Sequence, residues 1–454
     1  MGSGVAAGAT TSRTRLHGLP ALRSRLAAAV LAFAVGIALL PLGVLSQGIS
    51  ERELDRIQSR VVELRRLELT APVGRTFMNR EELRAYNRET FFRDVTPEEL
   101  EATQTLLEVL GYIPLGMNLT QLLLDVLGEQ VLGFYDPATK NIYIVSDAER
   151  MTPDDEVTLA HEMTHALQDQ HYDLRANAEA RRHNNDRALA YQAMVEGDAV
   201  LSQSLYTLRY VPEALEESVS SPSPALDSAP LVLRRELIFP YEDGTSFVLQ
   251  AFQRGSWAAV DALWQRPPES TTQILHPEKY RAGQSPITVD LPDLGGALGS
   301  EWRELDDDTV GELDLTILIE QYVDRRTADQ AGTGWAGDHY KLLRRDRDGA
   351  VVFALRSTWE SETDAREFYS AYQRLADGRY GASNVQPGSL GGSLNASPLG
   401  RPDASWAVRS GAWNHVLVRD GVNVALAIYS DSVGDSIVDS LRPTNARSPV
   451  PAAR

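Results

Sequence analysis

The chain has 454 residues, a formal net charge of −19 and no cysteine. This length exceeds what one hydrophobic core usually serves and predicts two or three domains. The negative charge argues against a nucleic acid partner, because phosphate binding needs a basic surface, and the absence of cysteine excludes disulfides, thiol catalysis and thiolate metal sites.

The N-terminal segment has the pattern of a membrane anchor. Several arginines between residues 13 and 25 precede an uncharged, mainly apolar run from Leu26 to Leu45. A run of this length is enough to span a bilayer, and the positive flank favours a cytoplasmic N-terminus. We therefore predict a basic tail and signal anchor over residues 1–46, or a signal peptide if the segment is cleaved. The bulk of the chain should then be extracytoplasmic, anchored to the membrane or secreted after cleavage.

Several helices are predicted before the first motif. Apolar residues from Glu51 to Leu69 have helical spacing, which indicates an amphipathic helix and a stalk over residues 47–70. Capping patterns begin helices near Asn79 and Thr96, and a short buried helix is expected from Leu119 to Leu127. These segments have the pattern of a scaffold.

Two strand-like runs, Val131–Tyr135 and Ile142–Val145, flank turn residues and predict a β-hairpin. An exposed edge strand of this hairpin could pair with an extended peptide substrate by strand addition. A purely structural hairpin has the same pattern, and the sequence leaves both interpretations open.

An HExxH motif lies inside the next predicted helix. Thr152 is placed as its N-cap and Pro153 at its first position, so this helix has an independent reason to begin there. His161 and His165 are four residues apart and therefore project from one side of the helix. Two neutral imidazoles at this spacing can bind one zinc ion, and Glu162 can act as general base toward a water molecule that the metal activates.

The third metal ligand has two candidates. His171 has the spacing of the extended metzincin motif, but Gln168 replaces the glycine that turns the chain in that motif. A helix that continues through Gln168 would direct His171 about 120° away from the other two histidines. Glu196 lies in a second predicted helix, Leu189–Leu208, and is the preferred third ligand of a His2Glu site.

The C-terminal part has a different pattern. Residues 286–442 predict a separate α+β domain, in which Val351–Trp359 reads as a strand. His339 and His415 stand there without partner ligands, so no catalytic constellation is visible in this part. Residues 443–454 are expected to be disordered.

The sequence resembles the gluzincin clan of zinc metallopeptidases in four residues, His161, Glu162, His165 and Glu196. More narrowly, residues 70–285 resemble a largely uncharacterised group of bacterial and archaeal HExxH proteins. Four segments carry this resemblance: Gly133–Asp136, His161–Gln170, Val195–Ala199 and Gln273–Tyr280. The resemblance implies an α+β fold in which residues 71–285 form a mainly helical, zincin-like domain with a small β-hairpin or sheet.

The resemblance also implies further site residues. Gluzincins use a downstream His or Tyr to stabilise the oxyanion, and His276 and Tyr280 are the candidates here, although His276 could simply begin a helix. The sequence departs from the thermolysin pattern at Val200, where an Asp would orient a ligand histidine. Asp198 and Asp169 are the alternatives for this carboxylate.

Taken together, the residues predict an extracytoplasmic zinc metallopeptidase that hydrolyses peptide or protein substrates with Zn²⁺ as cofactor. The alternative from another class is a non-catalytic cell-envelope binding or assembly protein on a zincin scaffold. The large C-terminal domain without visible chemistry and the missing Asp after Glu196 favour that alternative.

Overall fold

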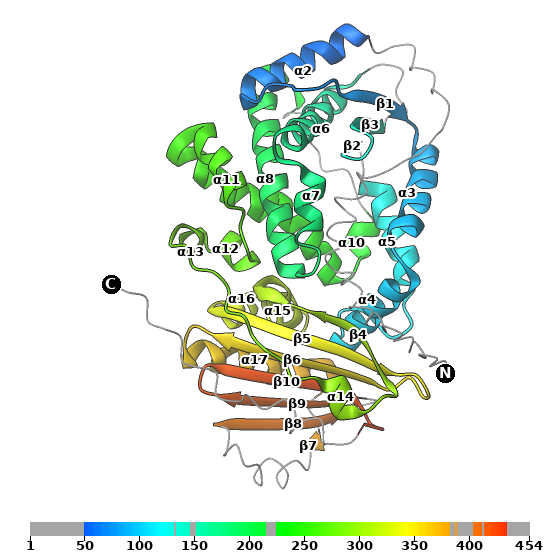
Figure 1. The fold of residues 1–454 in the computed structure, drawn as a ribbon, viewed down its shortest axis with the longest axis vertical. Coiled ribbons are helices and arrows are strands. Elements are labelled where there is room, and N and C mark those ends of the chain that lie inside the picture. The colour runs from blue at the N-terminus through cyan, green and yellow to red at the C-terminus, as the bar shows by residue number, and fades with distance from the viewer. Residues whose placement is uncertain are drawn as a thin grey trace, which may run out of the picture.

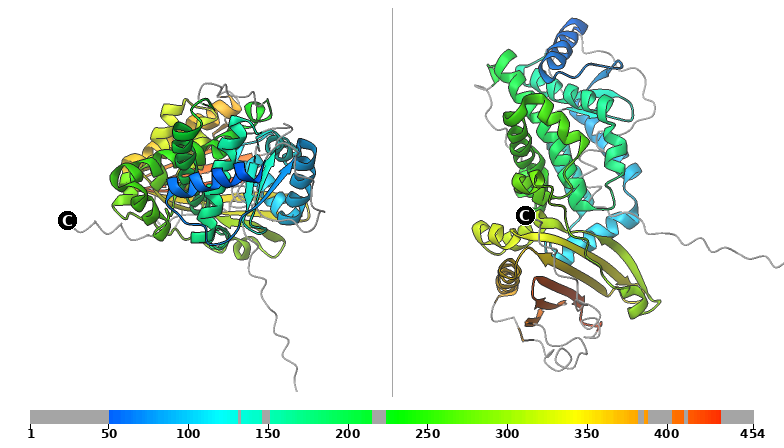
Figure 2. Two further views of the ribbon diagram at one scale, coloured as in Figure 1. Left: turned by 90° about the horizontal axis from the view of Figure 1, so that it is seen from above. Right: turned by 60° about the vertical axis from the view of Figure 1, so that its left-hand side comes forward.

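The computed structural model describes residues 50–130, 133–145, 151–214, 224–381, 386–387, 403–410 and 413–433. The fold is mixed α+β: a helical part with a small sheet lies against a second part that is built on a larger sheet (Figures 1 and 2). The predicted tail and membrane anchor fall outside these residues. Among the helices that are described, none combines the length and the apolar character needed to cross a membrane.

The helical part contains α2 (Glu51–Arg65), α3 (Arg80–Asp94), α4 (Pro97–Leu110), α5 (Leu119–Gln130), α6 (Pro153–Tyr172), α7 (Leu174–Glu179), α8 (Asn185–Tyr210), α10 (Pro224–Ser228), α11 (Leu231–Gln265), α12 (Thr271–Leu275) and α13 (Pro277–Arg281). Its small sheet is formed by β1 (Gly74–Met78), β2 (Gly133–Asp136) and β3 (Asn141–Val145).

The second part contains the strands β4 (Trp302–Asp308), β5 (Trp335–Arg345), β6 (Val351–Trp359), β7 (Gln386–Pro387), β8 (Ala404–Ser410), β9 (Trp413–Asp420) and β10 (Asn423–Ser430). Its helices are α14 (Leu294–Leu298), α15 (Gly311–Glu320), α16 (Arg325–Gly332) and α17 (Glu362–Tyr380).

The predicted hairpin is present as β2 and β3, which pair antiparallel. A third strand, β1, pairs with β3 in parallel, and the sheet order is β1-β3-β2. The sequence pattern did not reveal β1, because its partner strand lies far along the chain. Within the described residues β2 pairs only with β3, so β2 lies at an edge of the sheet. The helix α6 packs against both β2 and β3.

The helix predicted as a stalk is instead part of the folded core. Leu54, Ile57 and Val61 on α2 are buried in the main hydrophobic cluster, and α2 packs against α6 and α8. Arg65 at the end of α2 is fully buried and forms a bidentate ion pair with Asp198 on α8. The amphipathic pattern was recognised correctly, but its apolar face covers the metal-site helices.

The helices α8 and α11 pack closely against each other. A Cβ atom built on Gly197 would lie 2.2 Å from the carbonyl oxygen of Gly244, and one built on Gly244 would lie 2.1 Å from that of Ala193. Neither position therefore has room for a side chain. The two glycines let the backbones of α8 and α11 touch directly next to Glu196.

The large sheet is antiparallel, with the order β4-β5-β6-β10-β9-β8-β7. Alternate residues of β6 enter two different clusters, as the period of two in a strand requires. Phe353 and Leu355 pack in the main core with α15 and α17, whereas Val352 and Ala354 face a smaller cluster that contains Leu294 of α14. Both faces of the sheet are therefore covered.

The main hydrophobic core continues from the helical part into the second part. It includes Leu167 and Met194 on one side and Leu318 and Phe353 on the other. The hydroxyl of Tyr112 also donates to the backbone oxygen of Asp314 at 2.6 Å. The division into domains at residues 285/286 stays a prediction.

The crossing of α8 and α11 predicts the effect of Gly197→Ala. The substitution should lower the free energy of unfolding by about 1–3 kcal/mol, because the added methyl group overpacks the contact and outweighs the helix propensity of alanine. Urea denaturation measures this change. Gly295→Ala in α14 is the matched control, since its built Cβ lies 3.6 Å from the nearest atom. Equal stability changes in the two variants would contradict the interpretation.

Candidate metal centre

The helix that carries the HExxH motif begins and continues as predicted. Thr152 is the N-cap of α6, where its side chain and that of Asp155 form a reciprocal capping box, and Pro153 occupies the first turn. The helix runs without interruption through Gln168 to Tyr172. The five residues of the motif therefore lie on regular helix, which fixes the relative positions of His161 and His165.

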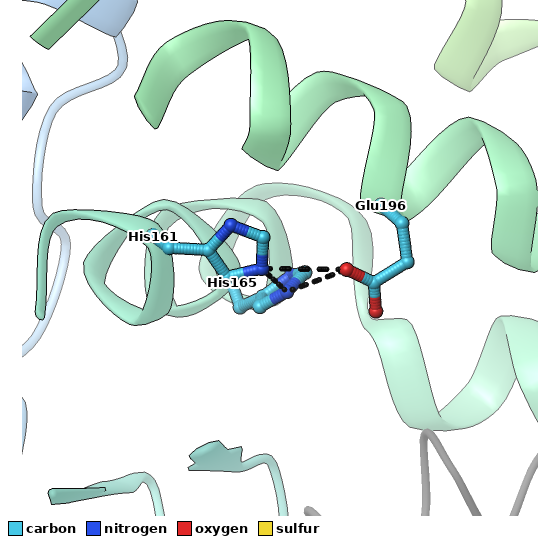
Figure 3. A group of neighbouring side chains, drawn as sticks. All are labelled: His161, His165 and Glu196. Atoms are coloured by element: carbon cyan, nitrogen blue, oxygen red, sulfur yellow. Dashed lines mark hydrogen bonds and ion pairs between the residues drawn. The ribbon is translucent and has the colours of Figure 1, made fainter. Parts of the chain in front are cut away.

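Three side chains converge between α6 and α8 (Figure 3). The Nε2 atoms of His161 and His165 lie 3.1 Å apart, and Oε2 of Glu196 lies 3.3 Å from the first and 3.4 Å from the second. All three residues are buried. This group can hold a metal ion, and it is the one such group of three or more His, Asp or Glu residues found in the described part of the chain.

Two glutamines orient the imidazole rings. Nδ1 of His161 lies 2.8 Å from Oε1 of Gln203, and Nδ1 of His165 lies 2.8 Å from Oε1 of Gln168. The amide of Gln168 is itself fixed, because its Nε2 donates to the backbone oxygen of Val195 at 3.1 Å. An oxygen acceptor requires a proton on Nδ1, so in the neutral form of each ring the Nε2 lone pair faces the other ring and Glu196.

The expectation of a carboxylate in this orienting role was wrong. Asp198 is bonded to Arg65 and to the indole N–H of Trp264, and Asp169 accepts from the hydroxyl of Tyr135 and from Lys140. Amide oxygens orient metal-bound histidines as carboxylates do, although without a formal negative charge.

The donor set fits a cation on electrostatic grounds. Two nitrogen lone pairs and a carboxylate oxygen that meet in a buried space repel one another unless a positive charge lies between them. Oε2 of Glu196 accepts no hydrogen bond from the described residues, which leaves it available for a metal ion. Imidazole nitrogen with carboxylate oxygen is a set that divalent transition metals bind.

The nearer histidine does not take part. Nε2 of His171 lies 2.8 Å from the backbone oxygen of Glu68, on a different side of α6 from the metal group. The replacement of glycine by Gln168 has the expected result, since the helix continues and His171 is directed away.

The side chain of Glu162 is buried beside the metal group. Burial and the negative charge of Glu196 raise the pKa of its carboxyl group, against the opposing effects of His161, His165 and the backbone N–H of Tyr135. Because Tyr135 belongs to β2, Glu162 lies between the metal group and the edge strand of the small sheet.

Tyr241 is a site residue that the sequence analysis missed. Its ring stacks on that of His161 with centroids 6.5 Å apart. Burial of its hydroxyl and the charges of Glu196 and Glu162 raise its pKa well above the usual value. Gly244 lies one helical turn further along α11, so the close crossing with α8 brings Tyr241 to the metal group. The sequence could not reveal this position beside the metal group, because aromatic residues at helical spacing are usually part of a hydrophobic core.

His276 and Tyr280 have other partners. Nε2 of His276 lies 2.7 Å from Oε1 of Glu312, and the hydroxyl of Tyr280 donates to the backbone oxygen of Arg266 at 2.7 Å. Figure 1 shows the short helices α12 and α13 well away from α6. His276 precedes Pro277 at the start of α13, as the alternative interpretation expected. The oxyanion role of these two residues stays a prediction.

Comparisons with known proteins leave the metal group unassigned. A family model described as a domain of unknown function (DUF8575) matches residues 300–428, from just before β4 into β10. No curated protein matches the chain. A crystal structure described as "a putative hydrolase with a novel fold" from Chloroflexus aurantiacus is 18% identical, covers 57% of this chain and 96% of that chain, and has a TM-score of 0.38.

The charges in the site predict that metal uptake releases a proton. Burial opposes a charge on His165, but Glu196 outweighs it and raises the pKa of His165 to about 9. The metal-free site therefore holds a proton below pH 9, and this proton must leave when the metal binds. Zinc titration at pH 7 should release about one proton per site, and the affinity should fall as the pH falls.

Calorimetry in buffers of different ionisation enthalpy measures this release. His171→Ala should leave it unchanged, whereas His165→Ala should abolish tight zinc binding. Binding without proton release between pH 6 and pH 8 would contradict the assignment.

Proposed function

We propose that this protein is a zinc-dependent metallopeptidase. The observation that carries the proposal is the convergence of His161, His165 and Glu196 beside the buried carboxyl group of Glu162. Two ligands that each lie about 2.0–2.1 Å from a tetrahedral zinc ion are about 3.3–3.4 Å apart. The separations of 3.1, 3.3 and 3.4 Å between the three donor atoms are close to this value.

Each residue then has a chemical task. His161, His165 and Glu196 would hold the metal, which supplies Lewis acidity to the scissile carbonyl and acidity to water. Glu162 takes a proton from the attacking water and passes it to the leaving amine. Its raised pKa suits this task, because a glutamate in a buried site accepts a proton more readily than an exposed one.

Tyr241 is placed to stabilise the oxyanion. A phenol is protonated at neutral pH, and the raised pKa of Tyr241 keeps it protonated into alkaline solution as well. Its hydroxyl can therefore donate a hydrogen bond to the developing negative charge. The residue is 40% exposed, which leaves its ring in reach of a substrate that approaches from solvent.

An extended peptide has a binding surface available at β2. This strand pairs with β3 on one side only in the described residues, and α6 packs against it. A peptide that adds to its free edge would run beside Glu162 and the metal group. We infer that the substrate is a peptide or an unfolded segment of a protein.

The location of this activity is also a proposal. The uncharged run Leu26–Leu45 and the preceding arginines support a chain that is anchored in the membrane, or secreted after cleavage, with its bulk extracytoplasmic.

Glu162→Gln tests the catalytic proposal. Hydrolysis of a broad peptide library should fall by about 10²–10⁴-fold while the zinc content stays the same, because the amide cannot accept the proton. Glu179→Gln on the exposed surface of α7 is the matched control. Unchanged hydrolysis in Glu162→Gln would refute the proposal. If His165→Ala loses zinc and melts at a lower temperature, and the parent protein hydrolyses nothing, the group belongs to a non-catalytic scaffold.

Tyr241→Phe tests the oxyanion role. Loss of one such donor typically costs about 10²–10³ in kcat, and KM should change little because the hydroxyl acts in the transition state. Tyr280→Phe provides the comparison, since it removes the same group from a phenol that is bonded to Arg266. If kcat falls in Tyr280→Phe and not in Tyr241→Phe, the oxyanion is stabilised by Tyr280, as the sequence pattern indicated.

A further inference from the structure

A groove of about 330 Å³ lies between the C-terminal half of α11 and the helix α13, and none of the metal-group residues lines it. Its walls are mostly apolar and include Phe247, Ala251, Leu263 and Pro277. A volume of this size is at the lower end of the range for pockets that hold small organic molecules.

The charged residues of this groove have one sign. Arg254, Arg266 and Arg281 line it, and no acidic side chain does. Arg266 lies over the ring of Tyr280 at 4.6 Å, and its Nη2 donates to the backbone oxygen of Tyr280 at 3.2 Å. Arg254 and Arg281 form no ion pair with the described residues. In a chain with a net charge of −19, three guanidinium groups without a carboxylate among them make a local exception.

A second pocket of similar volume has a different set of charged residues. The other pocket, about 340 Å³, lies where the loop before β4 and the strand β5 meet the start of α8. Its lining includes the acidic residues Asp186, Glu269 and Asp338 and also Arg187 and His339. Charges of both signs therefore line that pocket, whereas the charged side chains of the groove are all arginines.

The shape of the groove follows from a break in α11. Gly255 and Ser256 leave the helical conformation, and Ser256 has φ 56° and ψ −155°, a combination that non-glycine residues rarely adopt. After the break, the small side chains of Ala259 and Ala262 face the groove and leave its floor open.

We propose that this groove binds a long-chain carboxylate. The acyl chain would lie against the apolar wall, where its burial releases water from both surfaces. The carboxylate would lie among Arg254, Arg266 and Arg281, because a planar guanidinium group presents two N–H donors that match the two carboxylate oxygens. The site is separate from the metal centre and does not depend on the proposed peptidase activity.

Titration calorimetry of the full-length protein with sodium laurate, below its micelle concentration, tests this site. One laurate should bind per chain, and Arg254→Ala/Arg281→Ala should weaken binding at least about tenfold, because each charge-assisted contact is lost. Ala262→Trp, which fills the groove, should abolish binding. The exposed Arg175→Ala on α7 is the matched control and should bind as the parent does. Melting temperatures verify that each variant is folded.

Three outcomes would overturn the proposal. The first is that the double arginine variant binds laurate as tightly as the parent protein does. The second is that the parent binds dodecyltrimethylammonium as tightly as laurate. The third is that the parent binds vesicles of anionic phospholipid or a peptide C-terminus but does not bind laurate. Zinc content and Glu162-dependent hydrolysis should be unchanged in the arginine variants, so the two proposals succeed or fail separately.

Discussion

The buried ion pair between Arg65 and Asp198 holds the helical part together. Its two hydrogen bonds are 2.8 and 3.0 Å long, Trp264 donates to the same carboxylate, and Asp261 lies 2.8 Å from the guanidinium group. Two charges taken out of water are tolerated only when they are well paired, and removal of one partner typically costs about 3–5 kcal/mol. The pairing uses Nε and Nη2 of Arg65, while Nη1 has no hydrogen-bond partner among the described residues. The pair joins α2, α8 and α11, and thereby fixes the helix that presents Glu196.

Three consecutive residues of α8 serve three different neighbours. Glu196 faces the histidines of α6, Gly197 permits the close approach of α11, and Asp198 pairs with α2. Successive residues on a helix point about 100° apart, so three adjacent positions can address three surrounding helices. The position of Tyr241 depends on the same arrangement, because the contact at Gly244 sets how near α11 comes to the metal group.

Local signals in the sequence predicted the helix that carries the metal ligands. Contacts between residues that are distant in the sequence could not be predicted. Thr152 marks the helix start and Gln168 keeps it regular, and both act within a few residues of the motif. The orienting amide of Gln203, the phenol of Tyr241 and the strand β1 become neighbours of the site only through tertiary packing. Asp198 was one of two candidates for the orienting carboxylate. The sequence could not reveal its true partner, Arg65, because the amphipathic pattern of α2 does not show which helices α2 packs against.

The shortness of β2 has a consequence for what such a site can process. Its four residues extend about 13 Å, so a paired segment would be held over only a few peptide units. A folded protein seldom has four consecutive residues whose backbone hydrogen-bonding groups are unpaired. A segment of such a protein must therefore unfold locally before it can pair with the edge of β2. The rate at which a folded protein is cleaved would then depend on its equilibrium for local unfolding rather than on its amino-acid composition. Such a site would select proteins of low conformational stability.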